Sequence, residues 1–180
     1  MTRAWAIRLL AAAAAIGLSL TVATADEGAT TFAASMSGFH EVLPAAIGTG
    51  DVFSDGTGTF RATIHGDTLT YTETFSGLST PVTQSHIHFA ERAVNGGVFL
   101  FLCTNLGNGP AGTPACPAGG GTVTRTVSAA DFLGIAVQAF PAANFQAAVR
   151  VLRSGDAYVN VHTTKFPAGE IRGQIHFGDD

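Results

Sequence analysis

Charged residues are scarce in this sequence of 180 residues. They make up 12% of the chain, and Lys165 is the only lysine. The 13 acidic residues outnumber the 9 basic ones, which gives a formal net charge of −4. Nucleic acids and anionic membranes are recognised through clustered basic residues, and no such cluster is present. We therefore expect this protein to bind neither of them.

The motifs of several common enzyme classes are also missing. The sequence has no G-x-S-x-G nucleophile elbow, no Ser/His/Asp order and no phosphate-binding loop. The glycine run at 119–121 does not lead directly into a predicted helix, so it is not expected to hold a nucleotide phosphate. Any chemistry must therefore come from another kind of site.

The one long apolar run lies at the N-terminus. Arg3 and Arg8 precede an apolar run over residues 9–22. Residues 23–25 (Ala-Thr-Ala) then fit a small-residue cleavage site. We predict a signal peptide over residues 1–25 and a secreted protein, periplasmic or extracellular, with a single domain over residues 26–180. An uncleaved anchor is the alternative. The run is short for a membrane span, and no span is expected in the mature chain.

Cysteine is also rare, since only Cys103 and Cys116 are present. They flank a loop rich in glycine and proline, and an exported chain meets an oxidising environment, so we predict a disulfide. Closing such a loop stabilises a fold by about 3 kcal/mol in the chain-entropy model. Two free thiols are the alternative. A metal site at this pair is disfavoured because the tight C-x-x-C spacing is absent.

The rest of the chain contains many short segments of alternating apolar and polar residues, separated by turn residues. Strands are predicted at 32–36, 48–53, 58–65, 68–75, 85–89, 98–102, 122–127, 158–163 and 171–176. Turns every 8–12 residues predict an all-β fold, an antiparallel Greek-key β-sandwich or a barrel. One short helical insertion is predicted near residues 128–153, where apolar residues recur at helical spacing.

The candidate site begins with two histidines one residue apart on a predicted strand, His86 and His88. Side chains alternate faces along a strand, so both imidazoles point the same way, about 7 Å apart along it. Ile87 and Phe89 then point towards a core. The pair is either a set of metal ligands or two polar residues on a solvated sheet face.

A third histidine, His162, lies on another predicted strand whose Val159 and Val161 face the core. If that strand neighbours the His86 strand with the same face outwards, three imidazoles converge. Such a set suits copper or zinc, and copper binds nitrogen ligands more tightly. An open fourth position would permit redox or hydrolytic chemistry, and the loop at 103–121 is expected to cover the site.

The last predicted strand adds two residues on the outward face. With the turn centred near Pro167, we expect Arg172 to lie opposite His162 and His176 to lie opposite Tyr158, although this register is an assumption. His176 is then two residue pairs away from His162. This separation favours a position outside the ligand set over a role for His176 as a ligand.

Four segments resemble, in their order along the chain, the signature segments of the CHRD domain, a module named after the vertebrate BMP antagonist chordin. They are Glu-Val-Leu-Pro at 41–44, Ser-His-Ile-His at 85–88, Tyr-Val-Asn-Val-His-Thr at 158–163 and Gly-Glu-Ile-Arg-Gly-Gln-Ile at 169–175. The resemblance covers about residues 32–177, and the loop between the two cysteines looks like that of the secreted bacterial subgroup. The family implies an extracellular all-β domain and no settled biochemical activity.

An H-x-H strand with later histidines on a β-sandwich is also similar to the copper site of copper-zinc superoxide dismutases. In that family paired strand histidines ligate copper, and a nearby arginine guides the anion. The matching positions here, three for ligands and one for the anion guide, are His86, His88, His162 and Arg172. A fourth ligand would have to be His176 or His40. No aspartate and histidine cluster matches the zinc site, so the resemblance leaves a copper-only variant.

Two functions are therefore considered. The first is a secreted metal-binding domain, with copper preferred and zinc as the alternative; as an enzyme it would be a copper-dependent, superoxide dismutase-like oxidoreductase. The second is a non-catalytic extracellular module that binds a protein or polysaccharide, or a surface or matrix component. Ring nitrogens of the three histidines within about 4 Å of one another would favour the first, because metal–nitrogen bonds are 2.0–2.1 Å long.

Overall fold

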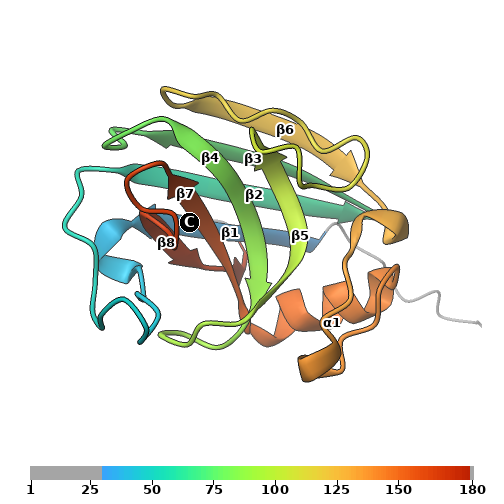
Figure 1. Ribbon diagram of the computed structural model, residues 1–180. Coiled ribbons are helices and arrows are strands. Elements are labelled where there is room, and N and C mark those ends of the chain that lie inside the picture. The colour runs from blue at the N-terminus through green and yellow to red at the C-terminus, as the bar shows by residue number, and fades with distance from the viewer. Residues whose placement is uncertain (1–29, 179–180) are drawn as a thin grey trace, which may run out of the picture.

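The computed structural model describes residues 30–178, so the predicted signal peptide at 1–25 lies outside the described residues. Within the described part of the chain, nine antiparallel strands form a nearly closed, barrel-like sheet, and one α-helix packs beside it (Figure 1). The predicted all-β antiparallel fold is confirmed, and its shape is that of a barrel. None of the described helices is long and apolar enough to cross a membrane.

The strands occur along the chain as β1 (Thr30–Ser37), β2 (Thr57–His65), β3 (Thr68–Ser76), β4 (Val82–Phe89), β5 (Gly97–Thr104), β6 (Gly121–Val127), β7 (Ala157–Thr163), β8 (Ile171–Gln174) and β9 (His176–Phe177). Three 3₁₀ turns and one α-helix complete the fold: η1 (Gly38–His40), η2 (Ala129–Asp131), η3 (Ala136–Gln138) and α1 (Phe145–Ser154). In space the order of strands is β5-β4-β7-β8-β1-β2-β3-β6, and β9 pairs with β1. The pairing of β4 with β7 decides where the histidines meet.

Buried and more exposed residues alternate along β3, as the sequence pattern predicted. Leu69, Tyr71 and Phe75 are buried in the barrel. The threonines between them face threonines of β6, and three pairs of hydroxyls form hydrogen bonds of 2.8–3.0 Å. The Tyr71 hydroxyl donates to the Leu102 carbonyl of β5 at 2.6 Å. This bond links β3 to β5 across the interior and helps to close the sheet.

One predicted strand, at 48–53, is wrong, because these residues belong to the loop between β1 and β2. Gly48 and Gly50 have φ angles of 133° and 117°. Such angles interrupt an extended strand, and they favour glycine. The loop is fastened to η1 instead, where the Val52 N–H donates to the Gly38 carbonyl at 2.9 Å.

The hairpin of β7 and β8 pairs two residues away from the expected register. Asn160, and not His162, lies opposite Arg172, which centres the turn near Phe166 instead of Pro167. A shift by an even number of residues leaves each side chain on the face that the alternation predicted. Arg172 and His162 therefore still share a face.

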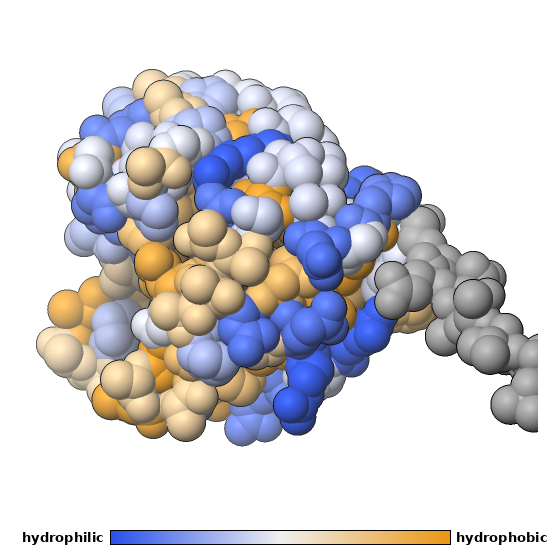
Figure 2. All heavy atoms as spheres, turned by 90° about the vertical axis from the view of Figure 1, so that its right-hand side faces the viewer, coloured by the Kyte–Doolittle hydropathy of each residue, from blue (hydrophilic) through white to orange (hydrophobic). Residues whose placement is uncertain are grey.

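The helical insertion predicted near 128–153 is confirmed, with η2 and η3 preceding α1. The Asn144 side chain accepts a backbone N–H bond at 2.9 Å and caps the start of α1, and Gly155, with a φ of 81°, ends it. The apolar side of α1, which includes Phe145 and Leu152, packs against the barrel. On the side of the molecule where α1 lies, apolar residues extend from the middle of the face to its lower left, and hydrophilic residues lie mainly above them and to the right (Figure 2).

Cys103 and Cys116 form the predicted disulfide. The loop that it closes lies against the beginning of β4, where the Asn108 amide donates to the Gln84 side chain at 2.9 Å. The disulfide thus anchors the loop near the start of the strand that carries the paired histidines.

Two buried glutamates have opposite surroundings. Inside the barrel, the Glu73 carboxyl accepts one hydrogen bond, from the Ser85 hydroxyl at 2.6 Å, and burial raises its pKa to about 8. Glu170 accepts four hydrogen bonds from hydroxyl and backbone groups. Burial alone would raise the pKa of Glu170, but these bonds outweigh it and hold the pKa below its ordinary value.

The two glutamates are expected to respond differently to pH. Because the pKa of Glu73 is raised on folding, its contribution to stability is present below its ordinary pKa and is lost as pH rises towards 8. The stability of Glu73→Gln relative to the natural protein should therefore increase from pH 5 to pH 8, by up to about 1.4 kcal/mol per pH unit. Urea unfolding at both pH values measures this difference.

Glu170→Gln is the control for that experiment. The folded pKa of Glu170 is lowered, so its contribution is present above its ordinary pKa and lost only at more acidic pH. The destabilisation caused by Glu170→Gln should be the same at pH 5 and pH 8. A constant stability difference for Glu73→Gln over that range would contradict the assignment of a raised pKa.

Candidate metal centre

Antiparallel pairing of β4 with β7 brings the three predicted histidines together. His86 lies opposite Asn160, and Gln84 lies opposite His162, so His162 is the diagonal neighbour of His86 on the same face. The other face of β4 carries Ser85 and Ile87, which are buried in the barrel. The imidazoles therefore lie on the outer side of the sheet, as the alternation predicted.

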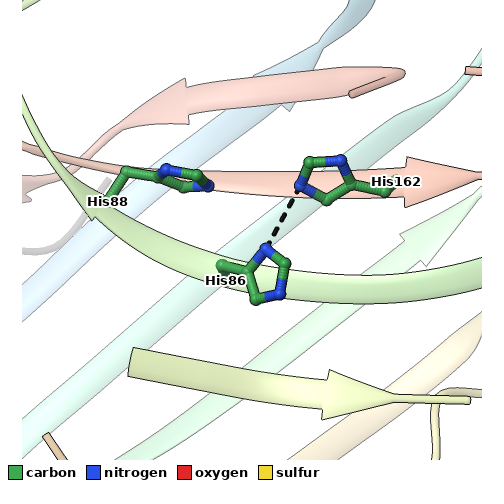
Figure 3. Close-up of side chains that lie close together, drawn as sticks. All are labelled: His86, His88 and His162. Atoms are coloured by element: carbon green, nitrogen blue, oxygen red, sulfur yellow. Dashed lines mark hydrogen bonds between the residues drawn. The ribbon is translucent and has the colours of Figure 1, made fainter. Parts of the chain in front are cut away.

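The imidazoles converge on one another (Figure 3). The Nδ1 atom of His86 is 3.2 Å from the Nε2 atom of His162. One ring nitrogen from each of His86, His88 and His162 lies within 4.8 Å of the others. Two nitrogens bound to one metal at 2.1 Å can be at most about 4.2 Å apart, so a pair at the upper limit of 4.8 Å would have to close by about 0.6 Å to share an ion.

Two backbone carbonyls orient the rings. The Nδ1 atoms of His88 and His162 lie 3.0 Å from the carbonyl oxygens of Gly96 and Pro167, respectively. A carbonyl can only accept, so each Nδ1 carries the proton and each Nε2 keeps its lone pair. Metal-binding histidines characteristically donate their other ring N–H in this way. Both rings are thus held in the tautomer that a metal ion requires.

The histidines are buried, so a solvated sheet face is the wrong interpretation. His86, His88 and His162 are 3%, 9% and 6% exposed. Burial lowers the pKa of His88 and of His162 to about 4, and burial together with the two neighbouring imidazoles lowers the pKa of His86 to about 2. All three rings are neutral at pH 7, which is the charge state in which histidine binds a metal.

The donor set fits a transition metal. The Nε2 atoms of His86 and His88 are buried and have no hydrogen-bond partner, and a buried polar atom without a partner is costly unless something else occupies its lone pair. For His88 that lone pair points into the group. The Nε2 atom of His86 points away from it (Figure 3), and its Nδ1 donates to Nε2 of His162, so the proton of His86 must move to Nε2 before Nδ1 can bind a metal. Three neutral imidazoles without a carboxylate suit copper or zinc and do not suit calcium or magnesium.

Aromatic rings enclose two of the imidazoles. The Phe101 ring of β5 meets His86 edge-on, with centroids 4.3 Å apart. The Tyr158 ring of β7 stacks on His88, with centroids 4.7 Å apart and an angle of 4° between the planes. The predicted cover, the loop at 103–121, lies at the start of β4 instead. The backbone groups that form hydrogen bonds with His88 and His162 are the carbonyls of Gly96 and Pro167.

The remaining predicted site residues lie elsewhere. His176 is on β9, exposed, and pairs with Ala33 of β1 instead of Tyr158, and it is not a member of the three-histidine group. His40 is an exposed residue of η1 and also lies outside the group. Arg172 is on the expected face of β8, but it is only 2% exposed.

Sequence reasoning missed several residues around the centre. Glu41 is buried, and its carboxylate accepts a hydrogen bond from the amide of Asn160, between Tyr158 and His162 on β7. Burial raises the pKa of this carboxyl. Glu41 belongs to the first of the four segments that carried the family resemblance. That resemblance was the signal in the sequence that could have identified Glu41 as a residue near the centre.

The sequence model of the CHRD domain family matches residues 32–175 of the chain. The chain belongs to the CHRD domain family. No curated protein and no solved structure matches it.

The four segments that carry the family resemblance meet at this face of the barrel. Glu41 comes from the first, the paired histidines from the second, His162 from the third and Arg172 from the last. CHRD domains are extracellular-type modules, which agrees with the disulfide. The bacterial subgroup and the similarity to superoxide dismutases stay predictions.

The lowered pKa values predict how the metal-free centre titrates. Between pH 7.5 and pH 5 we expect the rings of His86, His88 and His162 to stay largely unprotonated and to show no titration midpoint, because their pKa values lie near or below 4. A histidine of lowered pKa stabilises the fold above its ordinary value of about 6.5 and loses that contribution as pH falls towards 4. NMR titration of the metal-free protein measures this, and midpoints near 6.5 for these rings would contradict it.

Proposed function

We propose that this CHRD domain binds one transition metal ion through His86, His88 and His162, with copper preferred and zinc as the alternative. The observation that carries the proposal is the convergence of three buried, neutral imidazoles, two of them held by carbonyl oxygens with their lone pairs directed into the group. The Nε2 atom of His88 has no hydrogen-bond partner, and a merely structural cluster would gain from pairing it with a donor.

Copper is preferred because of the ligand type. The group contains nitrogen donors only, and for such sites copper lies above zinc in the order of affinities. The protein holds the rings in place, keeps them unprotonated and shields them from bulk water. A bound copper ion would supply one-electron redox chemistry.

The proposed location is outside the cytoplasm. The predicted signal peptide at 1–25, the disulfide between Cys103 and Cys116 and the family itself support secretion. An exported protein competes for metals in a compartment without the reducing thiol pool of the cytosol.

Superoxide dismutation is the enzymatic form of this proposal. It requires a position at the metal that the substrate can reach, and the three ligands leave a fourth position unfilled. The burial of the rings argues against easy access. The proposal is therefore metal binding, and dismutation is measured separately on the copper-loaded protein.

Metal analysis of the purified, tag-free protein tests the proposal. We expect about one equivalent of copper in the natural protein and an affinity at least about 100-fold weaker in His86→Ala/His88→Ala, because two of three ligands are lost. His40→Ala/His65→Ala is the matched control, since both residues are exposed and outside the group. Equal metal content in the natural protein and the His86/His88 variant would sink the proposal.

A second candidate function is supported by exposed aromatic side chains. Phe39 and Phe53 are 57% and 88% exposed, and their rings lie in edge contact with centroids 6.1 Å apart. Ile47, in the same loop region, is 64% exposed. Exposed apolar groups of this kind mark interaction surfaces, which favours a module that binds an extracellular polysaccharide or protein.

Sedimentation with insoluble polysaccharides tests this second function. If the surface binds such a polymer, Phe39→Ser/Phe53→Ser should reduce the bound fraction about tenfold or more, because the aromatic contact area is lost. Leu106→Ser is the control, since Leu106 is 56% exposed on a different loop. Equal sedimentation of the double variant and the natural protein would count against this surface.

A further inference from the structure

A stack of three side chains connects the metal centre to β8. The Tyr158 ring lies parallel to the His88 imidazole, with centroids 4.7 Å apart. The guanidinium carbon of Arg172 lies 3.3 Å from the centroid of the same ring. Planar guanidinium groups stack favourably on aromatic rings. The tyrosine ring thus contacts both His88 and Arg172.

The guanidinium is also bonded to the loop between β4 and β5. Its Nη1 donates to the Asn95 side chain at 3.1 Å, and its Nη2 donates to the Val94 carbonyl at 2.8 Å. The next residue of this loop, Gly96, accepts the N–H of His88 through its carbonyl. Its own N–H donates to the Tyr158 hydroxyl at 3.3 Å.

Two physical paths therefore lead from Arg172 to one ligand. The first path is the stack through Tyr158, which limits rotation of the His88 ring. The second path is the loop, whose Gly96 carbonyl keeps the proton on Nδ1 of His88 and leaves Nε2 free. Both paths act on the orientation and the tautomer of the same imidazole.

We infer that Arg172 is a positioning residue for His88: it holds the loop and the stacked tyrosine that direct the His88 Nε2 lone pair into the metal centre. Its relation to metal affinity rests on the proposed metal-binding function. An anion guide would present free N–H groups to solvent. Arg172 is instead 2% exposed, and its terminal nitrogens donate to loop acceptors.

The variant Arg172→Lys separates positioning from charge. Lysine keeps the positive charge but lacks the planar fork that bonds two loop acceptors while stacking on the ring. Loss of such an outer partner typically lowers metal affinity 10–100-fold. We expect a loss in this range, and a mixture of His88 tautomers in place of the single Nδ1–H form.

The experiment has two readouts. Long-range ¹H–¹⁵N NMR of the metal-free protein reports the His88 tautomer, and competition with a chromophoric chelator reports copper and zinc affinity. Arg125→Lys is the matched control, because Arg125 also forms a structural contact, an ion pair with Asp131 on a different part of the barrel. It should leave both readouts unchanged.

The outcomes distinguish the inference from the proposed function. If the natural protein binds neither metal, the proposed function fails, while the tautomer of His88 in the metal-free protein still decides the positioning role. If Arg172→Lys folds and retains the natural tautomer and affinity, the inference is overturned. If Arg172→Lys does not fold, Asn95→Ala decides by the same two readouts, because it removes one acceptor of the guanidinium and leaves Arg172 in place.

Discussion

The candidate site depends on the antiparallel pairing of β4 with β7. This pairing places His162 diagonally across from His86, although 76 residues separate them in the chain. It also places Tyr158 directly opposite His88, where the two rings stack. Without that ladder the chain would contain an isolated pair of histidines and a distant third. With it, a single sheet face carries the whole group.

Burial of this face follows from the loops, and it changes the chemistry of the residues. The carbonyls of Gly96 and Pro167 belong to the connections that follow β4 and β7, and each satisfies one ring N–H of a histidine. Neutral imidazoles with fixed tautomers are the outcome, because a charged ring would be costly in a buried position. The loop between β4 and β5 also bonds to Arg172, whose guanidinium is accommodated by stacking and by hydrogen bonds. Polar groups on the outside of the barrel thus form a second buried layer.

Two buried glutamates show contrasting solutions to the same cost. Glu73 has a single hydrogen bond and a raised pKa, so protonation accommodates its burial. Glu170 instead has four donors and a lowered pKa, so it is accommodated as a carboxylate. The number of donors within reach, and not burial alone, decides which form each residue takes.

Alternation and composition by themselves determined much about this protein. They were sufficient to predict the all-β class, the shared face of His86 and His88, and the disulfide, since these follow from local periodicity and from chain proximity. The strand at 48–53 failed because its glycines take up positive φ angles, which alternation does not reveal. Only the tertiary structure decided that β4 and β7 are neighbours, that loops bury the histidines, and that Arg172 points into a loop. Those features depend on contacts between residues far apart in the chain, and local sequence pattern carries no information about such contacts.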